Sequence, residues 1–521
     1  MFHVPLYFEG LRSRPLLVFW LATLAQALLW TLVPFVFYAA PPGELPEVLA
    51  IGHEFQLNGD FGPPLAYWLA EIAFGAAGLF GVYALSQFCL IATYWCVFVL
   101  GRAIVGATHA AMAVLLMVGI SVFAAPTPNF GPPVLAMALW AAALLFYWRA
   151  VMEDRREYWY ALGGTVALLL VTTGGALILV AALLLITALT ERGRRAAHAV
   201  EPWIVMAGLI GFLCVHVFWL ERAGVALTPV LASLRRAGMG GGNAIGWLRL
   251  IAALIAAHAG LAVLVVLASG WPRTRVQPAP AVARTPVTPA AVTFVTAFAL
   301  IPALLATVVA ALAGGRAPVG GAAPLLVLSG LAVILAAGNS VELHHQRILG
   351  FAWAGLLVVP AIFIPAVIGF LPWATGTELK VAQPATAMGR FFADNFARRT
   401  GQPLAVVSGD QHVAELIALG APSRPSVYFA DDPAHSPWVT AQDIREKGAV
   451  IVWPTLDTDP APPPDIKARF PDLVPEVPHN FVRPVRGRLP PLLIGWGVIR
   501  PASTPTAAAS PPAPHANGVA Q

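Results

Sequence analysis

The segment from Ala40 to Leu65 reads Ala40-Pro-Pro-Gly-Glu44-Leu-Pro-Glu47, continues through His53-Glu54, and closes with Asp60-Phe-Gly-Pro63-Pro64-Leu65. It lies between two long apolar stretches and holds four carboxylates. A chain that is poor in charge has little reason to gather four acids in one short loop unless they face water and act there. This loop is therefore the leading candidate for a functional site.

The composition around this loop is that of a membrane protein. Hydrophobic residues make up 58% of the chain and charged residues only 11%, far from the balance of a soluble globular protein. Apolar runs of roughly 20 residues, long enough to cross a bilayer, recur up to about residue 372. The first run, Pro15 to Tyr38, exceeds the ~7–15 residues of a signal-peptide core, so we expect an uncleaved span.

The apolar runs and the breakers between them predict an all-α polytopic fold with about eleven spans. Leu65 to Gly78 is interrupted and carries Glu71, so we expect it to form a juxtamembrane helix. The stretch 159–190 is divided at Thr172-Thr-Gly-Gly175, a turn-like cluster. The expected spans lie near 15–38, 81–101, 107–125, 133–151, 159–173, 176–190, 203–219, 245–270, 291–313, 322–337 and 349–371.

The net charge of +5 is explained by topology. With the N-terminus inside, thirteen arginines fall in cytoplasmic segments and five in the outer segments that precede the C-terminal part, which fits the positive-inside rule. This placement argues against nucleic-acid binding. It also predicts that the acidic loop and everything after Pro372 lie outside the cytoplasm. The three cysteines all fall in predicted spans, so no disulfide framework is expected.

The composition from Trp373 onward is that of a soluble domain. We expect a transmembrane module over 1–372, an exported α/β domain over 373–500 and a disordered tail over 501–521. Strands predicted at 403–408, 426–430 and 449–453 alternate with helices at 411–419 and 440–447, which favours parallel pairing. Another strand is expected from Leu492 to Ile499, and Asp410 is expected to cap the first helix.

Glu44 follows a stiff Pro-Pro-Gly approach, and Leu45 to Leu57 shows the apolar spacing of an amphipathic helix lying on the bilayer. A carboxylate held at a water–lipid boundary suits general-base catalysis, because partial desolvation raises its pKa toward neutrality. The alternative is that these acids form the solvated face of an interfacial helix. Both interpretations fit the residues alone.

The loop resembles the signature of the GT-C glycosyltransferases, in the family of the protein O-mannosyltransferases and the aminoarabinose transferases of lipid A. In that family an acid follows the first span, a helix leads to a second acid, and Pro-Pro-Leu opens a juxtamembrane helix. Glu44, Glu54 and Pro63-Pro64-Leu65 fall at matching spacing. The chain departs from the pattern because Glu44-Leu45 replaces the usual Asp-Glu. In addition, Phe61-Gly62 replaces Asp-His, with Asp60 one position early.

The resemblance implies an enzyme that takes a sugar from a polyprenyl-phosphate donor, without a nucleotide, on the outer face of the membrane. The acceptor would be a lipid, glycan or protein, and single displacement would invert the anomeric centre. Glu44 is the expected catalytic base, with Glu54 and Asp60 as competitors. Glu47, Pro63 and Pro64 are expected to contact substrate. No cofactor is expected, and the alanine- and arginine-rich usage favours a bacterial inner membrane.

A leaving phosphate needs positive charge. Arg235-Arg236, followed by Gly238, Gly240-Gly-Gly242 and Asn243, offers two guanidiniums and free backbone N–H groups that suit a phosphate. The alternative is a flexible loop whose arginines contact membrane lipid headgroups. Arg222 and Arg249 are weaker candidates of the same kind. No metal site is expected, since His344 and His345 point about 100° apart on a helix.

Two other functional classes stay open from the sequence. One is a transporter or flippase of lipid-linked or small substrates, although neither repeated halves nor broken helices with midplane polar residues are evident. The other is a catalytically inactive relative that serves as an assembly partner, which the change from Asp to Glu at position 44 leaves possible.

Overall fold

The computed structural model describes residues 5–57, 62–222, 243–270, 281–313, 321–430 and 436–502. The chain divides into two compact units. The first comprises Met1–Gln383 together with Arg483–Pro490, and the second comprises Pro384–Val482 together with Pro491–Gln521. The division at Gln383 lies eleven residues beyond the predicted boundary at 372.

The first unit is a helical bundle. Six helices in its described ranges are long and apolar enough to cross a membrane, which confirms a multi-pass membrane protein. Their bounds are Pro15–Phe37 (α2), Leu65–Val105 (α4), Pro132–Met152 (α6, Pro132–Tyr147, with the π turn η2, Trp148–Met152), Trp247–Ser269 (most of α12, Asn243–Ala257, with α13, Ala259–Ser269), Pro289–Ala311 (within α14, Pro289–Ala313) and Gln346–Ala374 (α16).

Shorter apolar helices cover the remaining predicted spans, so the number of spans stays a prediction. These are Ala107–Met117 (α5), Tyr158–Leu170 (α7), Ala176–Leu189 (α8), Glu201–Val215 (within α10, Glu201–Arg222) and Pro324–Ala336, which includes α15 (Ser329–Ala336). The smaller elements of this unit are α1 (Pro5–Ser13), α3 (Leu45–His53), η1 (Ser121–Phe123), α9 (Glu191–Ala196), η4 (Lys380–Ala382) and a two-stranded ribbon of β1 (Ala281–Ala283) and β2 (Ser340–Glu342).

Two of the predicted breaks are confirmed and one predicted span is too long. Helices α7 and α8 are separate, as the turn at Thr172–Gly175 predicted. Helix α4 loses helical geometry at Ala77 and Gly78, where the juxtamembrane helix was expected to end. The helix predicted over 107–125 is too long, because α5 ends at Met117. Pro126 and Pro128 follow soon after, and proline disfavours helix in the residue before it.

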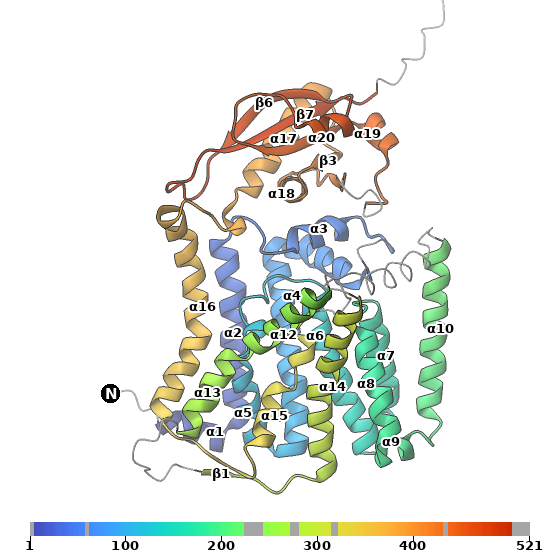
Figure 1. Cartoon of the computed structure of the whole chain (residues 1–521), viewed down its shortest axis with the longest axis vertical. Helices are drawn as coiled ribbons and strands as arrows, with labels where there is room; N and C mark the ends of the chain where they lie inside the picture. The colour runs from blue at the N-terminus through green and yellow to red at the C-terminus, as the bar shows by residue number, and fades with distance from the viewer. Residues whose placement is uncertain are drawn as a thin grey trace, which may run out of the picture. The chain divides into compact units, whose positions relative to one another are not determined.

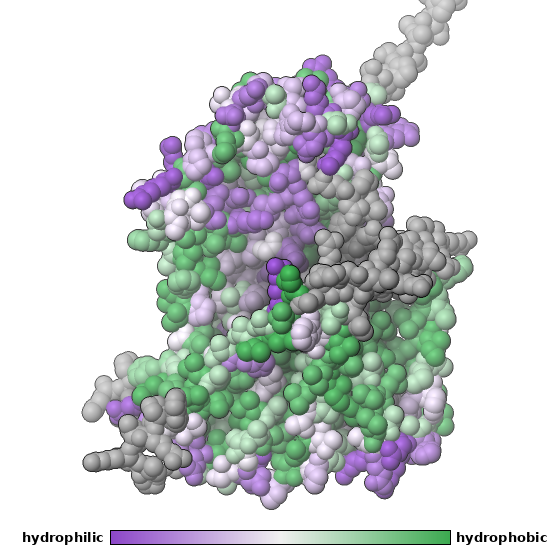
Figure 2. Space-filling model, viewed as in Figure 1, coloured by the Kyte–Doolittle hydropathy of each residue, from purple (hydrophilic) through white to green (hydrophobic). Residues whose placement is uncertain are grey.

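The two ends of the bundle differ in character. Helix α3 lies at one end, whereas α1, α9 and β1 lie at the other (Figure 1). The surface over the long helices is mainly hydrophobic, and hydrophilic side chains gather where α9 lies (Figure 2). Helix α9 contains Arg192, Arg194 and Arg195, and Arg192 donates to the Met152 carbonyl 3.4 Å away. Two of the arginine-rich connections that were predicted to be cytoplasmic, the one after Met152 and the one that contains α9, therefore lie next to each other at one end of the bundle.

The second unit is a five-stranded mixed sheet with the order β4-β3-β5-β7-β6. The strands are β3 (Val406–Gly409), β4 (Ser426–Tyr428), β5 (Ala449–Thr455), β6 (Val474–Phe481) and β7 (Leu492–Ile499). Among the described residues of this unit, four helices accompany them, namely α17 (Ala385–Thr400), α18 (Gln411–Gly420), α19 (Ala441–Lys447) and α20 (Pro464–Arg469). Strand β3 pairs in parallel with β4 and β5, as predicted, and Asp410 caps α18 by accepting from the Val413 amide at 3.0 Å.

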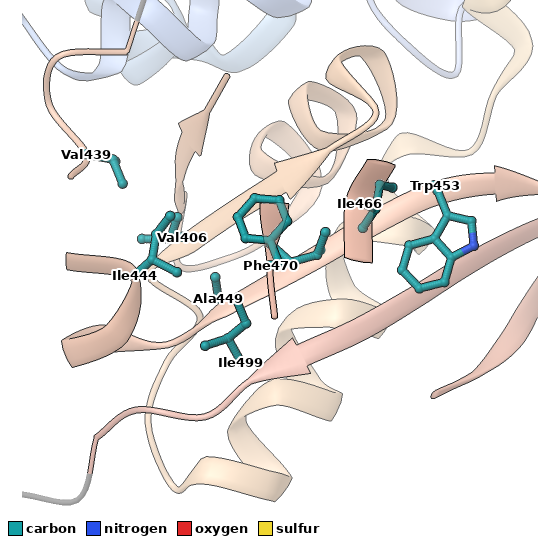
Figure 3. Close-up of a cluster of buried hydrophobic side chains, with 9 residues drawn as sticks. Val406, Val439, Ile444, Ala449, Trp453, Ile466, Phe470 and Ile499 are labelled. Carbon is teal, nitrogen blue, oxygen red and sulfur yellow. The ribbon is translucent and has the colours of Figure 1, made fainter. Parts of the chain in front are cut away.

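The prediction of parallel pairing fails at the other side of this sheet. Strand β7 is antiparallel to both β5 and β6. Strand β6 was not predicted, because Pro475 and Pro478 argue against a strand. Proline is nevertheless tolerated at the edge of a sheet, and β6 is an edge strand. Figure 3 shows the buried cluster on this sheet, in which Ile451, Trp453 and Ile499 from the central strands meet Ile466 and Phe470.

Candidate functional site

The loop from α2 to α3 is anchored at both ends. The amides of Ala39 and Ala40 donate to the Val381 carbonyl at 2.8 and 3.0 Å. The Leu45 amide donates to the Pro42 carbonyl at 3.1 Å and closes a tight turn through Gly43. Gly43 has φ = +56°, a conformation that glycine adopts without strain. Glu44 thus occupies a defined place at the start of α3.

Asn129, 85 residues further along the chain, holds the same turn. Its Oδ1 accepts a hydrogen bond from the Glu44 amide at 3.1 Å. A Cβ atom on Gly43 would lie 2.5 Å from Asn129 Nδ2. Glycine is therefore needed at position 43 both for the backbone conformation and for the close approach of this side chain. Nothing in our sequence analysis singled out Asn129.

Glu44 and Asn129 line one pocket of about 160 Å³. Its other described lining residues are apolar, and they come from α3, from the segment 122–137 and from the residues before η3 (Pro324–Leu326). They are Val48, Val122, Pro126, Phe130, Gly131, Pro132, Pro133, Val134, Met137, Ala322 and Ala323. Glu44 and Asn129 are thus the two polar residues in a lining that is otherwise apolar among the described residues.

Helix α3 ends at His53, four residues before the predicted Leu57, and most of its residues are buried. It packs closely on α4, since a Cβ on Gly52 would overlap the Tyr67 carbonyl oxygen. Glu47 is half-buried, and both it and Glu44 lie near Tyr67 of α4. These two carboxylates and Tyr67 therefore share one region. The alternative of a solvated face does not fit half-buried Glu47, but it fits Glu44, which is exposed and lacks the partial desolvation expected for the base.

The second predicted acid, Glu54, lies just past the end of α3 and is half-buried. Its neighbour His53 pairs through Nδ1 with Glu71 Oε1 at 3.0 Å, which ties the end of α3 to α4. The structure does not bring Glu54 into the lining of the pocket that holds Glu44.

Pro63 and Pro64 open α4 next to this region. Pro64 is buried and forms the N-cap of α4. The following amide, that of Leu65, donates to the Val171 carbonyl at 3.0 Å. This contact gives the proline pair a positioning role at the start of the helix.

The predicted arginines and the third competing acid, Asp60, are only partly described. Asp60, Arg235 and Arg236 lie outside the described residues. Arg222 ends α10, and Arg249 is exposed on α12. Within the described ranges, no three His, Cys, Asp or Glu side chains gather closely enough to hold a metal ion.

A buried polar belt holds the pocket wall in place. Gln26 of α2 donates through Nε2 to the Phe123 carbonyl at 2.5 Å and accepts from the Tyr94 hydroxyl at 3.2 Å. Gln87 Nε2 donates to Thr127 Oγ1 at 3.0 Å, and Ser86 Oγ donates to the Thr127 carbonyl. All five side chains are almost wholly buried.

Polar side chains inside a membrane bundle are costly and are commonly tied to function. Here they satisfy the irregular backbone of residues 121–131, which has no helical ladder of its own. The sequence signal for this segment is its closely spaced prolines, Pro126, Pro128, Pro132 and Pro133, which preclude a continuous helix there.

Comparison with known proteins places this geometry in context. Residues 62–220 match the sequence model of the family described as dolichyl-phosphate-mannose-protein mannosyltransferase. That range includes Pro63 and Pro64 and begins after Glu44. No curated protein sequence matches the chain.

Among solved structures, the chain is similar to ArnT from Cupriavidus metallidurans bound to undecaprenyl phosphate. The TM-score is 0.56 at 13% identity, over 93% of this chain and 97% of that chain. AglB, the oligosaccharyltransferase of Archaeoglobus fulgidus, gives a TM-score of 0.41 at 13% identity, over 85% and 70%. The family model and the ArnT fold confirm the resemblance to the GT-C glycosyltransferases and the helical fold that it implies.

Proposed function

We propose that this protein is a membrane glycosyltransferase that moves a sugar from a polyprenyl-phosphate donor to an acceptor hydroxyl, with Glu44 as the general base. The observation that carries the proposal is the fixed position of Glu44, which lines a pocket and whose amide is bound by Asn129. The undecaprenyl phosphate bound to ArnT, a protein of the same fold, supports a lipid-phosphate donor.

The proposed reaction is a single displacement. The Glu44 carboxylate takes the proton of the acceptor hydroxyl, and the freed oxygen attacks the anomeric carbon. The bond from that carbon to the phosphate oxygen breaks, and the polyprenyl phosphate leaves with the electron pair. The anomeric configuration inverts because attack and departure take place on opposite faces. Arg235 and Arg236 are the proposed partners of the leaving phosphate, since guanidinium groups bind phosphate oxygens in pairs.

The reaction class is tested in cells and with purified protein. A deletion strain should lose one sugar from an envelope glycolipid, glycan or glycoprotein, as seen by mass spectrometry. Purified protein in liposomes that contain the polyprenyl-phosphate form of that sugar should transfer it to the acceptor identified in the strain. An unchanged set of envelope glycans, or a precursor trapped on the inner leaflet with full transfer activity in detergent, would instead support a transporter.

We further propose that the chain lies in a bacterial inner membrane with the Glu44 loop and the second unit on the outer side. The excess of arginine in the predicted cytoplasmic segments supports this orientation, as does the position of α1, α9 and β1 at the end of the bundle away from α3 (Figure 1).

The orientation makes a prediction for reporter fusions. Alkaline phosphatase joined after Leu371 should be active, and a green fluorescent reporter at the same point should be dark. Matched fusions after Arg195, in the α9 connection, should give the opposite pair of results. A fluorescent fusion after Leu371 would show that the C-terminal unit is cytoplasmic.

A further inference from the structure

The carboxamide of Asn129 is hydrogen-bonded to the protein through its oxygen, while its NH2 group lies close to Gly43. Asn129 ends a turn in which its own amide donates to the Pro126 carbonyl at 3.1 Å. Its Oδ1 accepts from the Glu44 amide at 3.1 Å. A backbone N–H can only donate, so this contact identifies the oxygen as the atom that faces the Glu44 amide and the NH2 group as the atom near Gly43. No residue in the described ranges accepts a hydrogen bond from Nδ2.

The surroundings of this NH2 group restrict what it can bind. Glu44 and Asn129 provide the only polar side chains among the described residues that line the pocket. The rest of that lining is proline, phenylalanine, valine, alanine, methionine and one glycine. A ligand must therefore offer a proton to the carboxylate, an oxygen to the carboxamide, and an apolar face to the wall.

A sugar ring with neighbouring hydroxyl groups meets all three requirements. One hydroxyl can donate to Glu44 while the next accepts from Asn129 Nδ2, and the C–H face of the ring can pack on Pro132 and Phe130. An anionic phosphate fits less well, because the Glu44 carboxylate would repel it and no cationic side chain belongs to the described lining. A single serine or threonine hydroxyl would leave the Asn129 NH2 group without its oxygen.

We propose that Asn129 is a substrate-binding residue and that the acceptor is a sugar. Nδ2 donates to the hydroxyl oxygen next to the one that Glu44 deprotonates. This inference rests on the proposed function for the role of Glu44, and it names the class of acceptor. The contact to the Glu44 amide would give Asn129 a second task, which is to hold the base at a set distance from the bound sugar.

Two variants separate the tasks of Asn129. Asn129→Asp keeps an oxygen for the Glu44 amide but removes the donor to the sugar, whereas Asn129→Ala removes both. If Asn129 were only an anchor for the loop, the aspartate variant would behave as the wild type and only the alanine variant would be impaired. If Asn129 binds the sugar, both variants should be impaired. Asn480→Asp, at an exposed position on β6, is the matched control for added charge.

Binding is measured without turnover, by saturation-transfer NMR of methyl glycosides with detergent-solubilised protein at pH 8, where ordinary carboxyls are ionised. We expect ring-proton transfer in the wild type and in Asn480→Asp, and about fivefold weaker binding in both Asn129 variants, the loss of one neutral hydrogen bond. Butyl phosphate should show no transfer that depends on Asn129. Full binding by Asn129→Asp, or competition by butyl phosphate at this pocket, would overturn the inference.

The outcome is separate from that of the proposed function. Glu44→Gln should bind methyl glycosides yet fail in transfer. If the Asn129 variants bind glycosides normally while Glu44→Gln is inactive in transfer, the acceptor inference fails and the glycosyltransferase proposal stands.

Discussion

Replacement of Glu44 by glutamine is expected to lower the rate of sugar transfer ~10²–10⁴-fold, the usual effect of losing a general base. Glutamine keeps the shape of the side chain but cannot take a proton. The contact that holds the loop uses the backbone amide of residue 44, so the substitution leaves the anchor to Asn129 intact. The measurement is initial transfer velocity in liposomes at saturating donor and acceptor, which reports kcat.

The competing acids are tested in the same assay. Glu44→Asp shortens the side chain by one methylene and should retain part of the activity. Glu47→Gln and Glu54→Gln should each lower the transfer rate less than Glu44→Gln does, because neither residue lines the pocket that contains Glu44. Glu191→Gln, exposed on α9 beside Arg195, should leave the rate unchanged. If Glu44→Gln turns over at the wild-type rate while Asp60→Asn or Glu54→Gln is inactive, the general base is not Glu44 and lies further along the loop.

Replacement of Gln26 by leucine is expected to destabilise the first unit and disrupt its site. The change removes the donor to the Phe123 carbonyl and the acceptor for the Tyr94 hydroxyl. Each buried partner left without a hydrogen bond costs about 1–3 kcal/mol. The sum, roughly 2–6 kcal/mol, is large against the stability of a typical domain. Because Phe123 belongs to the irregular segment 121–131 that contains Asn129, transfer activity should also fall.

The matched control lies one and a half turns along the same helix. Thr31 is buried, but its hydroxyl donates to the Ala27 carbonyl within α2, so Thr31→Val should cost no more than about 1 kcal/mol. Thermal unfolding in detergent and hydrogen exchange of peptides that cover 118–131 give the two readouts. Equal melting temperatures and equal exchange for the two variants would show that the polar belt does not hold the pocket wall.

Several features could be predicted from local sequence, and the structure confirms them. Apolar run length predicted the membrane helices, because a bilayer demands about 20 apolar residues whatever the neighbouring helices do. The break near Gly78 followed from the interrupted apolar run that carries Glu71, and the break at Thr172–Gly175 followed from a turn-like cluster. The acidic loop was recognised because carboxylates are rare in such a chain.

Other features depend on contacts between distant parts of the chain. The pairing of Asn129 with Glu44 spans 85 residues, and the contact from Gln26 to Phe123 spans 97. No periodicity or spacing in the sequence indicates which polar side chain will meet which backbone group across the bundle. The antiparallel β7 likewise depends on where a long connection returns, and the strand pattern was the same for either direction.

The sequence by itself therefore determined a membrane bundle, its main breaks, a separate α/β second unit and an acidic loop after the first span. These follow from burial and local backbone preference, which act within a few residues. Only the tertiary structure decided that Glu44, rather than Glu54, lines the pocket. It also decided that Asn129 is the partner of Glu44 and that intramembrane polar groups support the wall. The reason is that an irregular segment inside a bundle must find hydrogen-bond partners on whichever helices pack against it.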